Sequence, residues 1–229
     1  MTCPKSLKTN LLGVAIYTCY VFFMANVVLG ASTSNFTQTI TAGTLSIDIV
    51  DGSYVTVGSP SVAFGSVAFS FACRTAGNRT AGTFGTASQV IYVQNPDAAD
   101  GGWTASLAGS AVTNVWDSAG TDYDFNDAGG SGCTDGADAD SVGGQMTVDA
   151  SAGTLAAGAC LACVTTNITK GSSTAYVQAT TDSVTLLTAA AGSDDIGDWK
   201  LTGVSILNTV PAEQPAAADY DINMTLSIV

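Results

Sequence analysis

Apolar and polar residues alternate along much of the chain with a period of two. The clearest case is the last stretch, DYDINMTLSIV, in which polar residues separate Tyr220, Ile222, Met224, Leu226 and Ile228. Successive side chains of a β-strand point to opposite faces of the sheet. The stretch therefore predicts a strand with one buried face and one exposed face.

Short windows of the same kind recur at 44–50, 61–72, 88–96, 103–109, 144–150, 173–179, 182–189 and 199–207. In the window SVAFGSVAFSFA we expect Phe64, Val67, Phe69 and Phe71 to lie on a strand, with Gly65 at a bulge or bend. No window has an apolar stripe of helical period with caps. About ten short strands separated by Gly, Asp, Asn and Ser turns predict an all-β protein, an antiparallel β-sandwich.

The first 31 residues have the order of a secretory signal peptide. Two lysines, Lys5 and Lys8, precede an uncharged apolar run at 11–30, and small residues follow at Gly30 and Ala31. The run is long enough to span a bilayer, so an uncleaved membrane anchor is the alternative. Cleavage would leave residues 32–229 as one secreted domain without a membrane attachment.

The charge of residues 32–229 is strongly negative. Four basic residues stand against nineteen acidic ones, a formal net charge of about −15, and Glu213 is the only Glu. Asp favours turns whereas Glu favours helices, which places the acidic side chains in loops. Binding to nucleic acid or to an anionic membrane needs Lys and Arg. We therefore expect neither partner.

Four cysteines follow the signal segment, and an even number in an exported chain predicts two disulfides. We expect Cys133 to pair with Cys160 and Cys73 to pair with Cys163. The CLAC sequence at 160–163 would alternatively be a redox or metal pair. However, the chain has no His and no second C-x-x-C to complete a zinc site, and no βαβ pattern surrounds the motif.

Residues 117–145 form an Asp- and Gly-rich run that we interpret as a long loop between strands. Asp122, Asp124 and Asn126 have the spacing of the first ligands of an EF-hand. Asp127 stands where that motif needs Gly, and Cys133 where it needs Glu, so the run is no EF-hand. Neighbouring carboxylates repel one another, and Ca²⁺ relieves this repulsion. The predicted calcium ligands are Asp117, Asp122, Asp124, Asn126, Asp127, Asp135, Asp138 and Asp140; the alternative is a solvated loop without an ion.

Catalysis has little support in the sequence. Without His, neither a Ser-His-Asp nor a Cys-His arrangement can form. A pair of Asp residues hydrolyses glycosides only when the pKa of one of them is raised, and the Gly-rich run offers no apolar surroundings to raise it. We expect a protein that is not an enzyme.

The residues after the signal segment resemble the mature start of the TasA/camelysin group of biofilm fibre proteins. The matching stretch is STSNFTQTITAGTLSIDIVDGS, in which Asn35–Thr37 and Ala42–Leu45 correspond to the group's first strand. The resemblance implies a jelly-roll-like sandwich at the cell surface. It also implies that residues 32–42 add as a strand to a neighbouring subunit, with Phe36, Thr37, Thr39 and Ile40 in the contact.

A second resemblance is to WxL-type bacterial surface domains, which bind the cell wall. GDWKLTG contains Trp199 and Leu201 in the W-x-L relation, whereas GGWTASLAG has Trp103 followed by Leu only at 107. Trp103 and Trp199 would alternatively be core residues. Trp116, beside the acidic run, is the predicted contact for a glycan.

Together these features predict a subunit of an extracellular fibre, pilus-like filament or surface layer. It would be a homopolymer assembled by strand donation and stabilised by calcium. The alternative is a monomeric surface module that binds cell-wall glycan or another carbohydrate.

Overall fold

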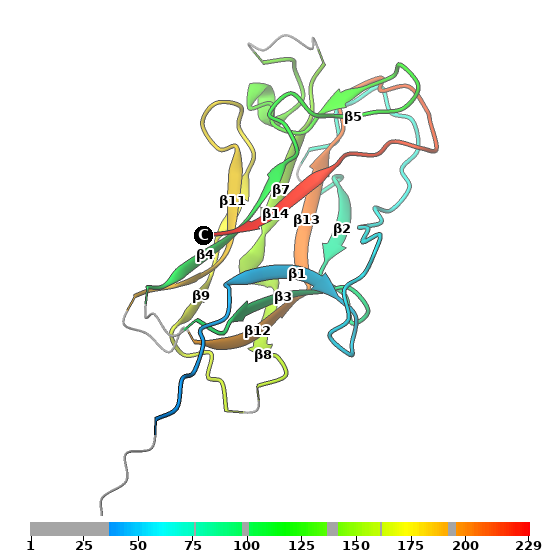
Figure 1. Cartoon of the computed structure of the whole chain (residues 1–229). Coiled ribbons are helices and arrows are strands. Elements are labelled where there is room, and N and C mark those ends of the chain that lie inside the picture. The colour runs from blue at the N-terminus through cyan, green and yellow to red at the C-terminus, as the bar shows by residue number, and fades with distance from the viewer. Residues whose placement is uncertain (1–36, 76, 98–100, 137–141, 161, 192–195) are drawn as a thin grey trace, which may run out of the picture. The chain divides into compact units, whose positions relative to one another are not determined.

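The structure is a computed structural model that describes residues 37–75, 77–97, 101–136, 142–160, 162–191 and 196–229. Ala42–Val229 form one compact unit, and the residues up to Thr41 form a separate one. The described part of the compact unit consists of strands joined by loops and two short 3₁₀ turns, Gly129–Ser131 and Ala150–Ala152 (Figure 1).

The strands form four antiparallel sheets, which we number I to IV. Sheet I has the order β1 (Ser46–Val50), β3 (Val90–Asn95), β12 (Gly197–Thr202), β8 (Thr154–Ala157). Sheet II has the order β10 (Ser173–Ala175), β7 (Gln145–Asp149), β13 (Val204–Thr209), β2 (Thr80–Phe84). Sheet III has the order β14 (Met224–Ile228), β4 (Trp103–Gly109), β11 (Ser183–Ala189), β9 (Ile168–Lys170). Sheet IV is the pair β5 (Val115–Trp116) and β6 (Tyr123–Asp124). The predicted all-β antiparallel sandwich is confirmed.

Sheets I and II are two halves of one bent sheet. The chain passes from β2 to β3, from β7 to β8 and from β12 to β13. In sheet I, β12 lies between β3 and β8, and in sheet II, β13 correspondingly lies between β2 and β7. Glycines lie at the bend: Gly85 has a φ of 80° and Gly203 a φ of 74°, and the Gly203 N–H donates to the Gly85 carbonyl at 2.7 Å. Positive φ is strained for residues with a Cβ, so glycine allows the chain to turn here.

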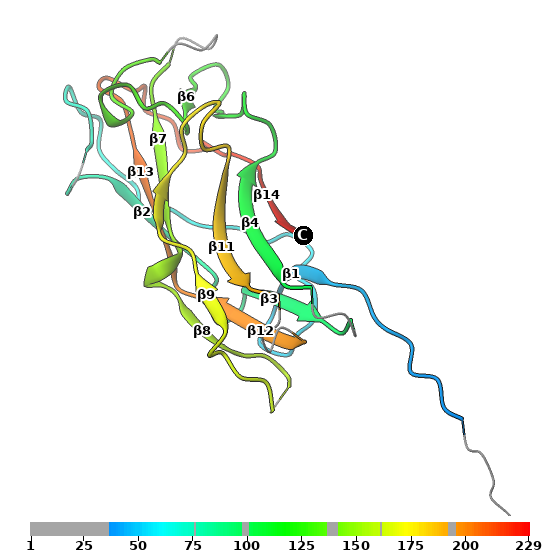
Figure 2. The same ribbon diagram turned by 90° about the vertical axis from the view of Figure 1, so that its left-hand side faces the viewer.

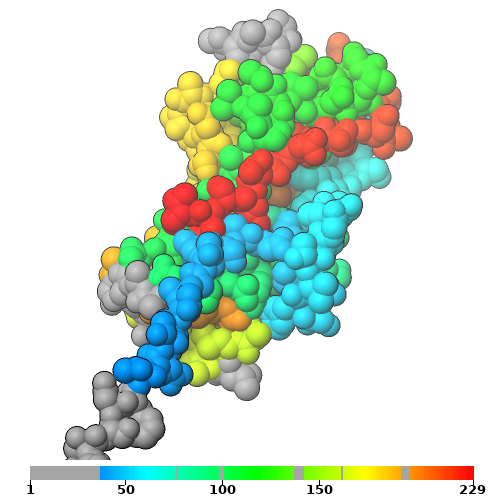
Figure 3. Space-filling model, viewed as in Figure 1, coloured from blue at the N-terminus to red at the C-terminus, as the bar shows by residue number. Residues whose placement is uncertain are grey.

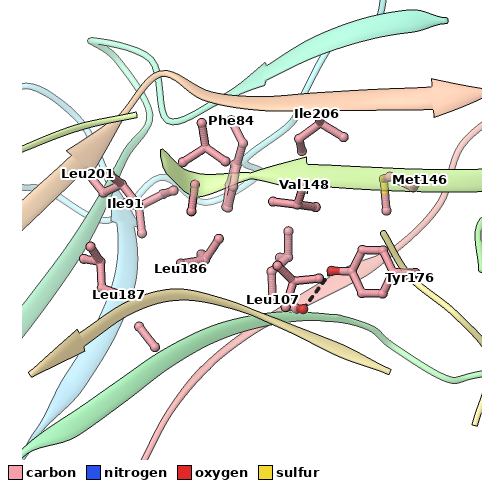
Figure 4. Packing of buried hydrophobic residues seen from close by; sticks show 14 of the residues in the cluster. Phe84, Ile91, Leu107, Met146, Val148, Tyr176, Leu186, Leu187, Leu201 and Ile206 are labelled. Atoms are coloured by element: carbon pink, nitrogen blue, oxygen red, sulfur yellow. Dashed lines mark hydrogen bonds between the residues drawn. The ribbon is translucent and has the colours of Figure 1, made fainter. Parts of the chain in front are cut away.

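Sheet III faces sheet II, and the core lies between them (Figure 2). Val148 and Ile206 point from sheet II toward Leu107 and Leu186 of sheet III (Figure 4). The buried Tyr176 hydroxyl donates to the Leu107 carbonyl at 2.7 Å, so its polar atom is satisfied within the core. Burial of these apolar faces stabilises the sandwich.

The C-terminal alternation is confirmed by the structure. Tyr220, Ile222 and the three apolar residues of β14 are half-buried against the core, whereas the polar residues between them are exposed. The strand itself begins only at Met224. The pattern thus predicted correctly which face is covered, although the regular strand is shorter than the pattern.

The predicted strand at 61–72 is wrong. Only Phe64 forms a bridge, to Gly82 of β2, and Val67, Phe69 and Phe71 are exposed. The rings of Phe69 and Phe71 pack edge to face on each other, with centroids 5.1 Å apart. The alternation of apolar and polar residues is present, but the chain leaves the sheet edge after Phe64, so the apolar residues beyond it are not buried.

Two further differences concern strand β2 and the pair β12 and β13. Strand β2 has the sequence TAGTF, in which small residues carry no apolar stripe, so its alternation does not predict a strand. The window at 199–207 is two strands, because Gly203 lies at the bend between sheets I and II.

Candidate functional site

A cavity of about 360 Å³ lies between the sheets and is lined mainly by apolar side chains. We call it the inter-sheet cavity. It is lined by Ile49, Pro60, Ser61, Val62, Phe64, Phe84, Leu107, Trp116, Met146, Ile206 and residues 220–224. Pro60, Ser61, Asp221 and Asn223 are exposed residues of this lining, so the cavity reaches the surface.

The cavity lies where the sandwich has edge strands. Strand β14 is the last strand of sheet III and β1 the last of sheet I, and the two lie beside each other. Figure 3 shows the C-terminal stretch (red) running between the green residues above and β1 (blue) and the cyan segment below. The inward apolar residues of both strands are only half-buried. An edge strand presents backbone N–H and C=O groups that can pair with another chain.

Trp116 forms one wall of the inter-sheet cavity. Its ring stacks on Tyr123, with centroids 5.8 Å apart, and meets the Phe64 ring edge to face at 5.2 Å. The side chain is only 7% exposed. Trp116 therefore does not lie at the surface, where the glycan contact is expected, because the β5–β6 pair places the indole inside the sandwich.

The indole N–H of Trp116 is buried and donates to no acceptor in the described part of the chain. A buried donor without a partner costs roughly 1–3 kcal/mol. A group that entered the cavity with a carbonyl oxygen would relieve this cost. Trp116 thus adds a buried donor without an acceptor to the lining of a mainly apolar cavity, and binding sites generally combine apolar walls with a few polar groups.

Trp103 and Trp199 are core residues, the alternative that the sequence left open. Trp103 is 3% exposed and Trp199 fully buried, and their ring centroids lie 5.5 Å apart. The imperfect W-x-L pairs thus contribute to packing.

Several carboxylates lie where the inter-sheet cavity opens to the surface, which we call its mouth. Asp117 is exposed and bridges Asp221 through the backbone, with N–H to carbonyl distances of 2.9 and 3.1 Å. A hydrogen bond with Asp122 and the charge of Asp122 raise the pKa of Asp117; desolvation and the charges of Asp221 and Asp219 add smaller contributions. Sequence reasoning missed Asp219 and Asp221, which follow the acidic run by about eighty residues and reach it only through the fold.

The inner part of the acidic run is not a solvated loop. Residues 123–127 are buried, with Tyr123 and Phe125 in the core. Asp124 Oδ1 accepts the Phe125 N–H at 2.6 Å, and Asp127 Oδ1 accepts the Gly136 N–H at 2.9 Å. The expected long excursion at 117–145 is thus partly a structural element of the sandwich.

The predicted calcium ligands occupy different places. Asp117 and Asp122 lie at the mouth, whereas Asp124, Asn126 and Asp127 are buried. Asp135 is exposed, and Asp138 and Asp140 lie outside the described residues. Within the described ranges no three of these carboxylates come within 4.8 Å of one another.

Asn126, one of these ligands, carries a buried oxygen without a hydrogen-bond donor in the described ranges. Asn126 is 1% exposed; its Nδ2 donates to the Val112 carbonyl at 2.9 Å, but its Oδ1 accepts no hydrogen bond from the described residues. An amide oxygen of this kind is a ligand that Ca²⁺ accepts.

The disulfides are Cys73–Cys133 and Cys160–Cys163, so the predicted pairing is wrong. The 3₁₀ turn Gly129–Ser131 brings Cys133 to the segment that precedes β2, with Cα atoms of Cys73 and Cys133 5.6 Å apart. The CLAC turn closes on itself. The C-x-x-C spacing offers a local signal for the second bond, whereas the Cys73–Cys133 bond depends on how distant loops pack on the sandwich.

The CLAC turn lies against Asp198 of β12. Asp198 Oδ1 accepts the Cys160 N–H at 2.8 Å, and Oδ2 accepts the Ala159 N–H at 3.2 Å and the Tyr92 hydroxyl. The two sulfurs and a carboxylate oxygen of Asp198 lie within 4.8 Å of one another. Because the sulfurs are bonded to each other, the predicted zinc alternative does not apply to this form.

Burial and the bond to Asp198 raise the pKa of Tyr92 from 10.0 to about 12. Between these values the folded protein keeps the phenol proton while the unfolded chain loses it. The free energy of unfolding should therefore fall by about 2–3 kcal/mol as the pH rises from about 10 to about 12. Denaturant titrations across this range should show a smaller fall for Tyr92→Phe; equal falls would contradict the assignment. Burial also raises the pKa of Tyr123 and Tyr176, so part of the fall should remain.

The predicted assembly residues lie in the N-terminal unit. Thr37, Thr39 and Ile40 are exposed, with Ile40 at 86%, and Phe36 lies outside the described residues. An isolated isoleucine at this exposure leaves its apolar surface in water.

Comparison with known proteins adds no relative: no family model, no curated protein and no solved structure matches the chain significantly. In the described ranges, no helix has the length and apolar character needed to cross a membrane. The fold and site therefore define the class by themselves: an antiparallel β-sandwich with two disulfides and a cavity open at its edge. Disulfides of this kind are compatible with an oxidising compartment such as the cell exterior.

Proposed function

We propose that the chain is an exported structural subunit of an extracellular fibre, filament or surface layer, assembled by strand donation. In this proposal the segment 32–42 of one copy enters the inter-sheet cavity of the next copy. The observation that carries the proposal is the cavity itself, which lies beside the edge strand β14 and is lined by Trp116, whose buried indole N–H has no acceptor in the described part of the chain.

The chemistry of the segment complements that of the cavity. Residues 36, 38 and 40 share one face of an extended segment, which gives Phe36 and Ile40 to the apolar walls and Thr37 and Thr39 to the opposite face. The backbone carbonyls of an inserted strand would offer acceptors to Trp116. Pairing with the outer edge of β14 would supply main-chain hydrogen bonds, the usual source of affinity in strand addition.

The described residues of the segment are also exposed. Residues up to Thr41 belong to a unit separate from the sandwich, and the described ones among them are exposed. Inserting Ile40 into a neighbour would remove its side chain from water, which stabilises an assembly by about 1.5–3 kcal/mol when burial is complete.

Calcium is the proposed stabiliser of this subunit. The outer site would use Asp117 and Asp122 at the mouth, and the inner one would use Asn126 with Asp124 and Asp127. The buried Asn126 Oδ1 and the raised pKa of Asp117 are consistent with an unmet need for positive charge in this region.

The test is electron microscopy of the exported protein, with calcium and with chelator, for the wild type and two variants. Ile40→Asp places a charge on the inserted face and should abolish filaments. Thr41→Asp, one residue away on the opposite face, is the matched control and should retain them. Monomers in the wild type under both conditions would overturn the proposal and leave carbohydrate binding as the alternative. Filaments in calcium alone would support the role of the ion.

A peptide comprising residues 32–42 tests whether this segment binds in the inter-sheet cavity or elsewhere on the protein. Added to protein that lacks these residues, it should change the tryptophan fluorescence, and Trp116→Phe should remove that change because Trp116 lines the cavity. A fluorescence change that persists in Trp116→Phe would place the peptide elsewhere.

A further inference from the structure

The CLAC turn places a short disulfide next to a buried carboxylate, an arrangement that the proposed assembly does not use. The turn contains the described residues 158–160 and 162–164, of which Ala159, Ala162 and Val164 are exposed and both cysteines half-buried. The sulfurs are therefore close to the surface. The Cys73–Cys133 disulfide, by contrast, joins segments sixty residues apart.

The two sulfurs differ in their surroundings. A Cβ on Gly197 would collide with the Cys163 sulfur, so this sulfur packs directly on the backbone of β12 and beside the Trp199 ring. Cys160 follows the exposed Ala159 in the turn. Cys160 is instead fixed through its backbone N–H, which donates to Asp198.

From this geometry we infer that Cys160, Cys163 and Asp198 form a thiol–disulfide exchange site, opened by a cysteine thiolate of another polypeptide that attacks the Cys160 sulfur. The new S–S bond forms to Cys160 while the Cys160–Cys163 bond breaks, and its electron pair leaves on Cys163. The Cys163 thiolate then takes a proton from water. A second thiol that attacks the mixed disulfide completes a two-electron exchange, in which one protein disulfide and two thiols give two protein thiols and one new disulfide.

Asp198 is a positioning residue with an electrostatic effect. Its hydrogen bonds to the N–H groups of Ala159 and Cys160 hold the turn, and Trp199 Nε1 holds the far side through the Val164 carbonyl at 2.8 Å. Its carboxylate repels both the attacking and the leaving thiolate, so it slows opening of the disulfide. At the observed separation, loss of the charge should accelerate opening roughly tenfold.

The experiment treats the exported protein with graded concentrations of reduced glutathione, quenches with an alkylating reagent and maps each cysteine by mass spectrometry. Cys73–Cys133 in the same molecule is the internal control. We expect Cys160–Cys163 to open at glutathione concentrations at least tenfold lower, with the circular dichroism of the sandwich unchanged, and the adduct to lie on Cys160. Opening of both disulfides together, or an adduct found mainly on Cys163, would overturn the inference.

Two variants distinguish the electrostatic effect of the Asp198 carboxylate from its structural role in holding the turn. Asp198→Asn should open about tenfold faster than the wild type, and this difference should shrink in high salt. Tyr92→Phe removes a hydrogen bond from the same carboxylate but keeps its charge, so it should open at nearly the wild-type rate. Equal acceleration in both variants would assign Asp198 a purely structural role and overturn its electrostatic part.

Discussion

Replacing both Cys73 and Cys133 by serine should lower the free energy of unfolding by about 4 kcal/mol. The disulfide closes a loop of sixty residues, and the loss of chain entropy in the unfolded state grows with loop length. The bond also ties the acidic run to the segment before β2, which carries the exposed Phe69 and Phe71. Urea denaturation followed by tryptophan fluorescence measures the change.

The matched control is the double serine variant of Cys160 and Cys163. This pair closes a turn with a separation of three residues, so the same entropy argument gives a loss of only about 2 kcal/mol. Equal losses in the two double variants, or a larger loss for the CLAC pair, would contradict the assignment of Cys73–Cys133 as the principal covalent constraint of the sandwich.

Trp199→Ala should destabilise the protein by about 3–5 kcal/mol, the range found for large buried aromatic side chains. Trp199 is fully buried, packs on Trp103 and donates its indole N–H to the Val164 carbonyl. Truncation would leave a cavity and orphan that carbonyl. Chemical denaturation measures the loss; Trp199→Phe, which keeps a ring in place, should lose less and remains measurable if the alanine variant does not fold.

Phe71→Ala provides the comparison for an exposed ring. Phe71 is 82% exposed, so its truncation should change stability by no more than about 0.5 kcal/mol. If the two alanine variants were equally stable, the placement of the tryptophan in the core would be wrong.

The proposed strand donation depends on two features, the inter-sheet cavity and the donor segment 32–42. The inter-sheet cavity is built by β5, β14 and the segment 60–64, whereas the candidate donor segment lies in a separate unit and carries exposed apolar surface. Donation would place the apolar surface of one copy in the cavity of the next. The CLAC turn, which lies against Asp198 of β12, does not take part in the proposed donation, so its redox behaviour and the assembly can be tested separately.

Particular residues show which parts of the fold were predictable from the sequence. The alternation of Tyr220 to Ile228 correctly predicted a half-buried face, because side-chain direction along extended backbone is a local property. The same rule was wrong for Phe69 and Phe71, because a pattern of alternation does not say whether a sheet edge continues beside it. The short strand β2 escaped prediction because its small residues carry no apolar stripe.

In the candidate site, too, local patterns were predictable from the sequence, whereas contacts between distant segments were not. Because Trp116 lies beside the acidic run, the sequence predicted a site there with Trp116 at the surface. In the structure, the β5–β6 pair buries Trp116. Asp219 and Asp221 joined the mouth only through the long-range bridge of Asp221 to Asp117. Asp198 had no signal at all, since its proximity to the CLAC sulfurs depends on the register of β8, β12 and β3.

The sequence by itself determined the fold class, the four cysteines available for two disulfides and the strong negative charge, because each follows from composition or from local periodicity. The tertiary structure alone decided the disulfide pairing, the burial of Trp116 and Asp124, the bend of the sheet at Gly85 and Gly203, and the cavity beside β14. These properties arise where segments distant in the chain meet, and contacts of that kind are selected by the packing of the whole sandwich.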